Sequence, residues 1–161
     1  MADFRALARK KQQLSDEQCK EILAQELRGV LAVNGDDGYP YCMPHNYYYN
    51  PDDGRIYFHS GKRGHKIDAL KRDARACFTV YRQDGRIPDR SWAFFYNSVV
   101  VFGRVEFVEE PELRTEIFRR LSYAFTNDSE YVESEIEKVG KATALFALIP
   151  ENMVGKRVKE E

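Results

Sequence analysis

Short segments in which apolar and polar residues alternate dominate the chain, and this pattern of period two predicts β-strands. The clearest segment is 93–108, which has the run Ser98-Val99-Val100-Val101-Phe102-Gly103 at its centre. We predict further strands over 29–33, 39–49, 55–60, 76–81 and 143–149, and a polar loop over 82–91. Most neighbouring strands are joined by short turns, so the sheet is predicted to be mostly antiparallel.

Two turn segments and two prolines refine this prediction. Residues 35–38 and 50–54 contain the Gly, Asn and Asp residues that tight turns favour. Pro40 and Pro44 fall within the predicted strand 39–49. Because proline has no N–H to donate, this strand is predicted to lie at a sheet edge or to bulge near Pro44.

Helical spacing is confined to a few segments. Ser15 and Gln18 form a predicted capping box, which is followed by apolar residues at helical spacing. Further helices are predicted over 64–71, from Pro111 onward and over 130–138. The predicted fold class is therefore mostly β with peripheral helices, in the form of a small antiparallel barrel. We predict one domain over 15–157, preceded by a flexible arm at 1–14.

Composition narrows the possible functions. The chain has 161 residues, 43% of them hydrophobic, and a formal net charge of −1. This charge argues against general nucleic-acid binding, and no apolar run is long enough for a membrane span or a secretory signal, so a cytoplasmic location is predicted. The three cysteines, Cys19, Cys42 and Cys77, form no CxxC pair and are predicted to be free thiols. No metal site is predicted, because the three histidines lack the spacing of known metal motifs.

The segment with the clearest chemical potential is 58–66, Phe-His-Ser-Gly-Lys-Arg-Gly-His-Lys. A predicted strand ends at Ser60, and a predicted helix begins near Gly64. The free amides at a helix start favour an anion, and glycine lets a ligand approach the backbone closely. Basic side chains gather at the same point, at Lys62, Arg63, His65 and Lys66. The residues predict either a site for one phosphate group or a solvated basic loop.

Three segments are familiar from a known family: 38–49, the strand 54–60, and Gly64-His65-Lys66. Together they resemble the pyridoxamine 5′-phosphate oxidase-like FMN-binding split barrels, and most closely their Nim branch of nitroimidazole-resistance-type flavoproteins. The Ser98–Gly103 run and the ending Asn152-Met153-Val154-Gly155-Lys156 fit the same branch. The resemblance covers about residues 15–157 and implies a single FMN-binding split-barrel domain. The chain differs from the oxidases themselves at His65, where they carry arginine. It also lacks their C-terminal signature.

The resemblance also implies roles for individual residues. It places Pro44, His45, Asn46 and Tyr47 beside the flavin ring, and His59 and Ser60 by its phosphate. His65 and Lys66 take the positions of the family's phosphate-binding pair, and Lys62 belongs to the same basic cluster. Ser98 is implied to reach the flavin from the other subunit. A homodimer with FMN between its subunits is therefore expected.

These expectations lead to one principal hypothesis and two alternatives. The principal one is an FMN-dependent oxidoreductase that takes electrons from NAD(P)H and reduces a small acceptor such as a nitroaromatic compound. His65 would then be catalytic, as a proton donor, or would only bind phosphate. One alternative is a protein that binds flavin or heme in the same barrel without turnover. The other is a relative that uses a deazaflavin.

Overall fold

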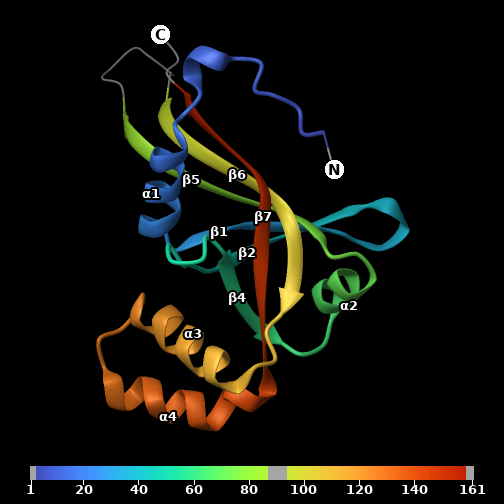
Figure 1. Ribbon diagram of the computed structural model, residues 1–161, viewed down its shortest axis with the longest axis vertical. Coiled ribbons are helices and arrows are strands. Elements are labelled where there is room, and N and C mark those ends of the chain that lie inside the picture. Colours follow the sequence, from blue (N-terminus) through green and yellow to red (C-terminus); the bar gives the residue numbers. More distant parts are fainter. Residues whose placement is uncertain (1–2, 87–93, 159–161) are drawn as a thin grey trace.

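A computed structural model describes residues 3–86 and 94–158. Seven strands form one curled sheet in the order β2-β1-β5-β6-β7-β4-β3, and all of the strand pairs are antiparallel (Figure 1). The fold is the split barrel expected from the sequence, with helices placed around it. The strands are β1 (Arg28–Asn34), β2 (Pro40–Asn46), β3 (Tyr48–Tyr49), β4 (Ile56–Gly61), β5 (Arg75–Arg86), β6 (Phe94–Phe107) and β7 (Thr143–Val158).

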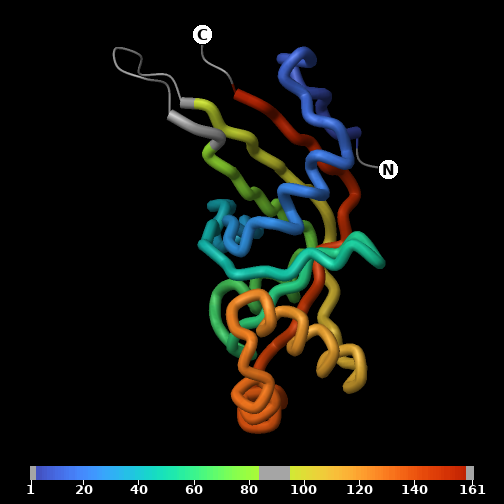
Figure 2. The backbone as a smooth tube through the Cα atoms, turned by 90° about the vertical axis from the view of Figure 1, so that its left-hand side faces the viewer, coloured from blue at the N-terminus to red at the C-terminus, as the bar shows by residue number. Residues whose placement is uncertain are grey.

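In the described residues, four α-helices and three short 3₁₀ turns surround the sheet. The helices are α1 (Asp16–Gln25), α2 (His65–Arg72), α3 (Pro111–Tyr123) and α4 (Ser129–Val139). The 3₁₀ turns are η1 (Lys10–Gln12), η2 (Asp36–Gly38) and η3 (Gly140–Ala142). Helices α3 and α4 lie together at the end of the molecule farthest from the N-terminal segment (Figures 1 and 2).

The predicted helix starts are confirmed. Ser15 and Gln18 form both bonds of a capping box at the start of α1, so two groups at the helix terminus are paired. Pro111 occupies the first turn of α3, where its missing N–H costs nothing. The side chain of Glu110 accepts hydrogen bonds from the backbone amides of Glu112 and Leu113.

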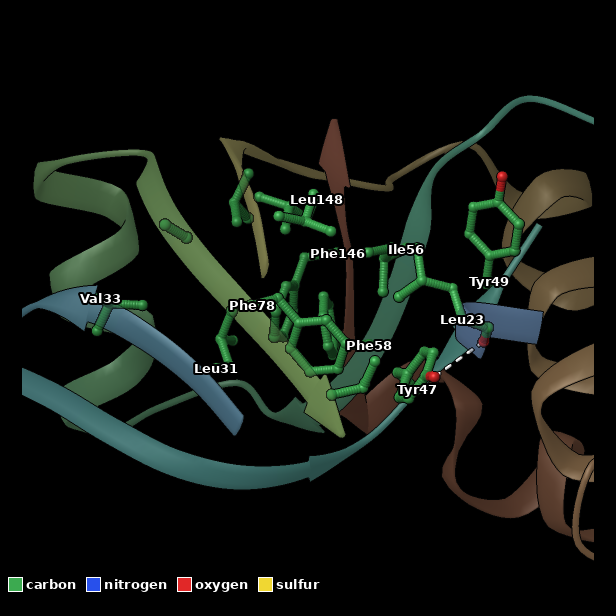
Figure 3. Packing of buried hydrophobic residues seen from close by; sticks show 14 of the residues in the cluster. Leu23, Leu31, Val33, Tyr47, Tyr49, Ile56, Phe58, Phe78, Phe146 and Leu148 are labelled. Atoms are coloured by element: carbon green, nitrogen blue, oxygen red, sulfur yellow. Dashed lines mark hydrogen bonds between the residues drawn. The ribbon is translucent and has the colours of Figure 1, made fainter. Parts of the chain in front are cut away.

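The barrel interior is filled by aromatic and aliphatic side chains. Phe58, Phe78 and Phe146 are fully buried, and the Phe58 ring lies 5.0 Å from Phe78 and 5.4 Å from Phe146 (Figure 3). A second cluster lies on the other side of β4, where Tyr57 packs with Ile117 and other residues of α3. Strand β4 therefore separates the barrel interior from the α3–α4 hairpin.

Some strand predictions required correction. β2 is an edge strand, as Pro40 and Pro44 indicated, and its pairing with β1 runs through Pro44 without a bulge. The predicted strand 39–49 is interrupted at Tyr47, which divides it into β2 and β3. The loop predicted over 82–91 was wrong for its first part, because β5 continues to Arg86 through pairing with β6. Residues 87–91 of that prediction lie outside the described part.

The segment before α1 contacts its own chain. Leu14 is buried, its amide donates to the carbonyl of Gly155, and Gln13 forms a bridge with Lys156. Farther out, the Phe4 ring lies 5.6 Å from that of Phe102. The flexibility expected for this arm stays a prediction. None of the described helices has the length and apolar character needed to cross a bilayer.

Candidate anion-binding site at the end of β4

The predicted phosphate corner has the expected backbone form. β4 ends at Gly61 and α2 begins at His65, so three residues connect them. Gly64, at the N-cap, has φ of 114°, a value that L side chains rarely adopt. No side chain caps the helix, and its first internal bond runs from the Asp68 amide to the Gly64 carbonyl. The first-turn amides are therefore available to an anion.

Lys66 projects from the first turn of α2 toward the rim of the barrel. Its Nζ atom lies 2.7 Å from Nε2 of His45 and 5.9 Å from the centre of the Phe146 ring. The side chain is half-buried, and this burial lowers the pKa of Lys66. A half-buried ammonium group therefore lies at the rim, next to the free amides of α2.

His45 fixes the orientation of that ammonium group. Its Nδ1 donates to the carbonyl of Asn46 at 2.9 Å, which leaves Nε2 as the acceptor from Lys66. The ring also makes edge contacts with Phe58 and Phe146. Burial lowers the pKa of His45 to about 4, and the charge of Lys66 contributes to this shift. His45 is therefore neutral near pH 7 and cannot compensate the charge of Lys66.

No carboxylate compensates it either. Within the described part of the chain, no Asp or Glu oxygen lies within 4 Å of Lys66 Nζ, and its hydrogen-bond partner there is neutral His45. A partly buried charge without a counter-ion is costly. The arrangement is therefore suited to an incoming anion, which the nearby amides would also bind.

His65, the predicted catalytic residue, points from the start of α2 toward the β1–β2 hairpin. Its ring stacks on Tyr41 with centroids 4.2 Å apart, and its Nε2 lies 3.5 Å from an oxygen of Asp36. Arg72 holds the same carboxylate and donates to the carbonyls of Asn34 and Gly35. The side chains of His65 and Lys66 therefore take different partners, although they are neighbours in sequence.

His59 lies on the α3 side of β4. Its ring approaches the edge of Phe118 at 6.4 Å, and its Nδ1 atom is buried without a hydrogen-bond partner among the described residues. Burial lowers the pKa of His59, so the ring is neutral near pH 7. The side chain of His59 contacts the α3–α4 hairpin. Only the backbone of His59 is therefore left to contact a phosphate group, as the resemblance predicted.

The remaining predicted residues are dispersed. The Ser60 hydroxyl donates to the carbonyl of Gly61, and exposed Lys62 lines a cavity with Glu109 and Arg114. The side chain of Tyr47 is buried, and its hydroxyl donates to the Leu23 carbonyl at 2.8 Å (Figure 3). This contact leaves only the Tyr47 backbone for a ligand at the rim.

Pro44 and Ser98 share the outer face of the sheet. Each alternates with residues that point inward, and Ser98 lies between Tyr81 on β5 and Lys156 on β7. Within one chain the structure therefore brings together His45, the Asn46 carbonyl and Lys66. The Asn46 side chain instead accepts a hydrogen bond from Arg28, and Ser98 lies on a separate surface.

Sequence reasoning missed three partners of this site. Phe146 lies beneath Lys66, and Asp36 and Tyr41 hold His65. Phe146 lies 80 positions after Lys66 in the sequence, and only the pairing of β4 with β7 brings the two regions together. The 35–38 segment indicates only a turn at Asp36, so the sequence gives a weak signal for its contact with His65. Among the described residues, no group of His, Cys, Asp or Glu is arranged to hold a metal ion.

Comparisons with known proteins agree with the fold. A crystal structure of a proposed 5-nitroimidazole antibiotic resistance protein from Bacteroides thetaiotaomicron matches with 22% identity and a TM-score of 0.73, covering 92% of this chain and 90% of the other. An FAD-binding protein from Mesorhizobium loti matches with 25% identity and a TM-score of 0.70, covering 91% of this chain and 97% of the other.

A third structure, the FAD and heme binding protein from Mycobacterium smegmatis, has 22% identity and a TM-score of 0.77, and the match covers 92% of this chain and 74% of the other. No curated protein matches the sequence. The profile of the family described as pyridoxamine 5′-phosphate oxidase matches residues 15–157, which is most of the chain. The chain therefore belongs to the pyridoxamine 5′-phosphate oxidase family and has its split-barrel fold.

Proposed function

We propose that this protein binds FMN and acts as an oxidoreductase that transfers electrons from NAD(P)H to a small acceptor. The observation that carries the proposal is the uncompensated charge of Lys66, held by neutral His45 beside the free amides of α2. This arrangement suits a single phosphate group, and the family places such a group on a flavin. A nitroaromatic compound is the acceptor that the resemblance to the nitroimidazole-resistance branch favours.

The residues at the corner fit the phosphate of the cofactor. Side chains built at Gly61 and Gly64 would meet no atom within 4 Å, so the backbone there is open to a ligand. Lys66 supplies positive charge, and Ser60 supplies a hydroxyl group. This hydroxyl now donates to the carbonyl of adjacent Gly61, and it could donate to a phosphate oxygen instead. Asn46, whose carbonyl holds His45, lies within the segment 44–47 that is expected beside the ring.

The flavin, when bound, supplies the hydride and electron transfer chemistry, and the protein supplies binding, orientation and charge. Lys66 and the α2 amides hold the anionic end, and His45 fixes the direction of the Lys66 ammonium group. His65 stays the proposed proton donor. Its support is the contact with Asp36 and Tyr41, which orients the ring at the same corner as Lys66.

Two of the similar proteins favour a flavin as the ligand. The Mesorhizobium protein is described as FAD-binding, and the Mycobacterium smegmatis protein as binding FAD and heme. For this chain we propose FMN, because the basic corner is compact and offers one anion site. Heme binding is the competing possibility, and the absorption spectrum of the purified protein distinguishes it from flavin binding.

The proposal includes a homodimer, because the predicted contact from Ser98 must come from a second copy. The outer face of the sheet around Ser98 supports this, since the Tyr81 side chain beside it is 70% exposed and Val100 lies on the same face. Large exposed aromatic side chains are typical of protein interfaces. Light scattering combined with size-exclusion chromatography measures the mass, and a monomer would contradict this part.

The experiment for the function begins with the absorption spectrum of the purified full-length chain. Flavin bands, with FMN released on denaturation, support the proposal. A Soret band would instead support the heme alternative. Oxidation of NADH or NADPH by the flavin-loaded protein, with a nitroaromatic acceptor, then separates an enzyme from a carrier. Flavin that stays oxidised with both nucleotides would contradict the enzymatic part.

A further inference from the structure

A cavity of about 210 Å³ lies between β4 and the α3–α4 hairpin, on the side of β4 away from the barrel interior. Phe118 and Leu121 of α3 and Val132 and Ile136 of α4 provide its apolar walls. It adjoins a larger cavity of about 420 Å³, which also borders Phe118 and Ile136. An apolar cavity of about 150 Å³ is already large enough to bind benzene, so this one has room for a substituted ring.

Several polar side chains line this cavity, and some of them lack a hydrogen-bond partner among the described residues. His59 lines it, with Nδ1 buried and unpartnered. Half-buried Ser122 and exposed Tyr131 also line it, and the side-chain hydroxyl of neither makes a hydrogen bond with another described residue. The buried Nδ1 atom of His59 is the group that lacks a partner, since buried polar groups are normally hydrogen-bonded. A mostly apolar cavity with a few polar groups is the usual form of a small-molecule site.

We propose that this hairpin cavity, bounded by β4, α3 and α4, binds a neutral, single-ring aromatic compound that carries a hydroxyl group. The aromatic and aliphatic walls select an apolar ring. His59 and the hydroxyls of Ser122 and Tyr131 select a group that both donates and accepts hydrogen bonds. The carboxylate of Glu135, which lines the same cavity, disfavours anionic compounds.

The protonation state of His59 agrees with a hydroxyl ligand. Burial lowers the pKa of His59, so the ring is neutral near pH 7. A neutral imidazole has one donor and one acceptor nitrogen, and a phenolic hydroxyl can pair with either. The cavity lies on the other face of β4 from the proposed flavin site, because Lys66 and His45 lie on the barrel side while His59 contacts Phe118.

The test uses phenol and toluene, which have the same number of heavy atoms and differ in the hydroxyl. Methyl groups of Leu121, Val132 and Ile136 in the full-length protein report ring-current shifts in methyl NMR spectra. We expect saturable shifts with phenol and at least threefold weaker binding of toluene, since a neutral hydrogen bond contributes about 1 kcal/mol. No saturable shift at these methyls, or equal affinity for both compounds, would overturn the proposal.

Two variants and one control locate the interaction. His59→Phe removes the polar atoms, so the preference for phenol over toluene should disappear. Ile136→Trp fills the cavity and should remove binding of both compounds, which keeps the proposal testable if His59→Phe does not fold. His65→Phe makes the same change at the other corner and should leave phenol binding unchanged. A preference for phenol that survives in His59→Phe would contradict the site.

Discussion

The ammonium group of Lys66 donates to Nε2 of His45 at 2.7 Å, while Nδ1 of the same ring donates to the Asn46 carbonyl at 2.9 Å. Both nitrogens of His45 are thus engaged, and protonation of Nε2 would bring two cations into contact. The ring therefore acts as a neutral spacer. It orients the Lys66 charge and leaves that charge free to attract an anion.

The protonation of His45 should make folding stability depend on pH. Its pKa is about 4 in the folded chain, below the unperturbed value of about 6.5. Between these values the unfolded chain binds more protons, so the free energy of unfolding should fall as the pH is lowered from about 6.5 to 4. The contribution of His45 is at most about 3 kcal/mol. Urea unfolding at several pH values measures it.

His45→Gln is the control, because glutamine does not titrate and can still accept a hydrogen bond. Its free energy of unfolding should lose part of the decline below pH 6.5. The decline that remains comes from other groups, including His59, whose pKa is also lowered by burial. Identical pH profiles for the variant and the parent protein would show that His45 is not a buried neutral ring.

The same residue should control phosphate binding through Lys66. His45→Leu removes the acceptor that orients the ammonium group, whereas His45→Gln retains one. We expect His45→Leu to weaken FMN binding about tenfold, roughly the value of one hydrogen bond to a charged group, with riboflavin binding unchanged. His45→Gln should retain most of the FMN affinity. An equal loss for FMN and riboflavin would indicate a general packing defect.

His65 should affect turnover more than flavin retention. Its ring is held by Asp36 and Tyr41, away from the Lys66 ammonium group. If His65 delivers a proton, His65→Ala should lower kcat by about 100-fold, within the range for general acids, while FMN stays bound. Asp36→Asn should lower kcat by a smaller factor, because it removes the carboxylate that holds the His65 ring. Unchanged kcat in His65→Ala would remove the catalytic role.

Gly103, at the end of the run that suggested the family, has a structural role. A side chain there would collide with the carbonyl oxygen of Ile149, where the β6–β7 pairing shifts register. Gly103→Ala should therefore destabilise the fold by about 1–3 kcal/mol. Gly140→Ala is the matched control, because its side chain would have only an ordinary contact at 3.7 Å. Chemical denaturation compares the two, and equal stabilities would contradict the packing argument.

The sequence predicts local features well where one short motif determines them. The capping box at Ser15 and the N-terminal proline of α3 are read from adjacent residues, and both are present. The edge position of β2 follows from its prolines, because they cannot pair on both sides. The extension of β5 beyond Tyr81 was missed, since pairing with β6 sustains a polar stretch that alone resembles a loop.

The candidate site was predicted only in part for the same reason. The residue types at the end of β4 identified an anion corner, and the backbone there has the expected form. Long-range pairing determines which side each residue faces, and this could not be read from spacing. It turns His59 toward α3 and buries the Tyr47 hydroxyl against Leu23.

The central claim is that Lys66 and the start of α2 bind the phosphate of FMN. Calorimetric titration of the flavin-free protein with FMN and with riboflavin tests this claim most directly, because the two compounds differ only in the phosphate. The account predicts that FMN binds at least tenfold more tightly than riboflavin, and that Lys66→Met removes most of this difference. Equal affinity for both flavins in the parent protein, or binding of neither, would contradict it.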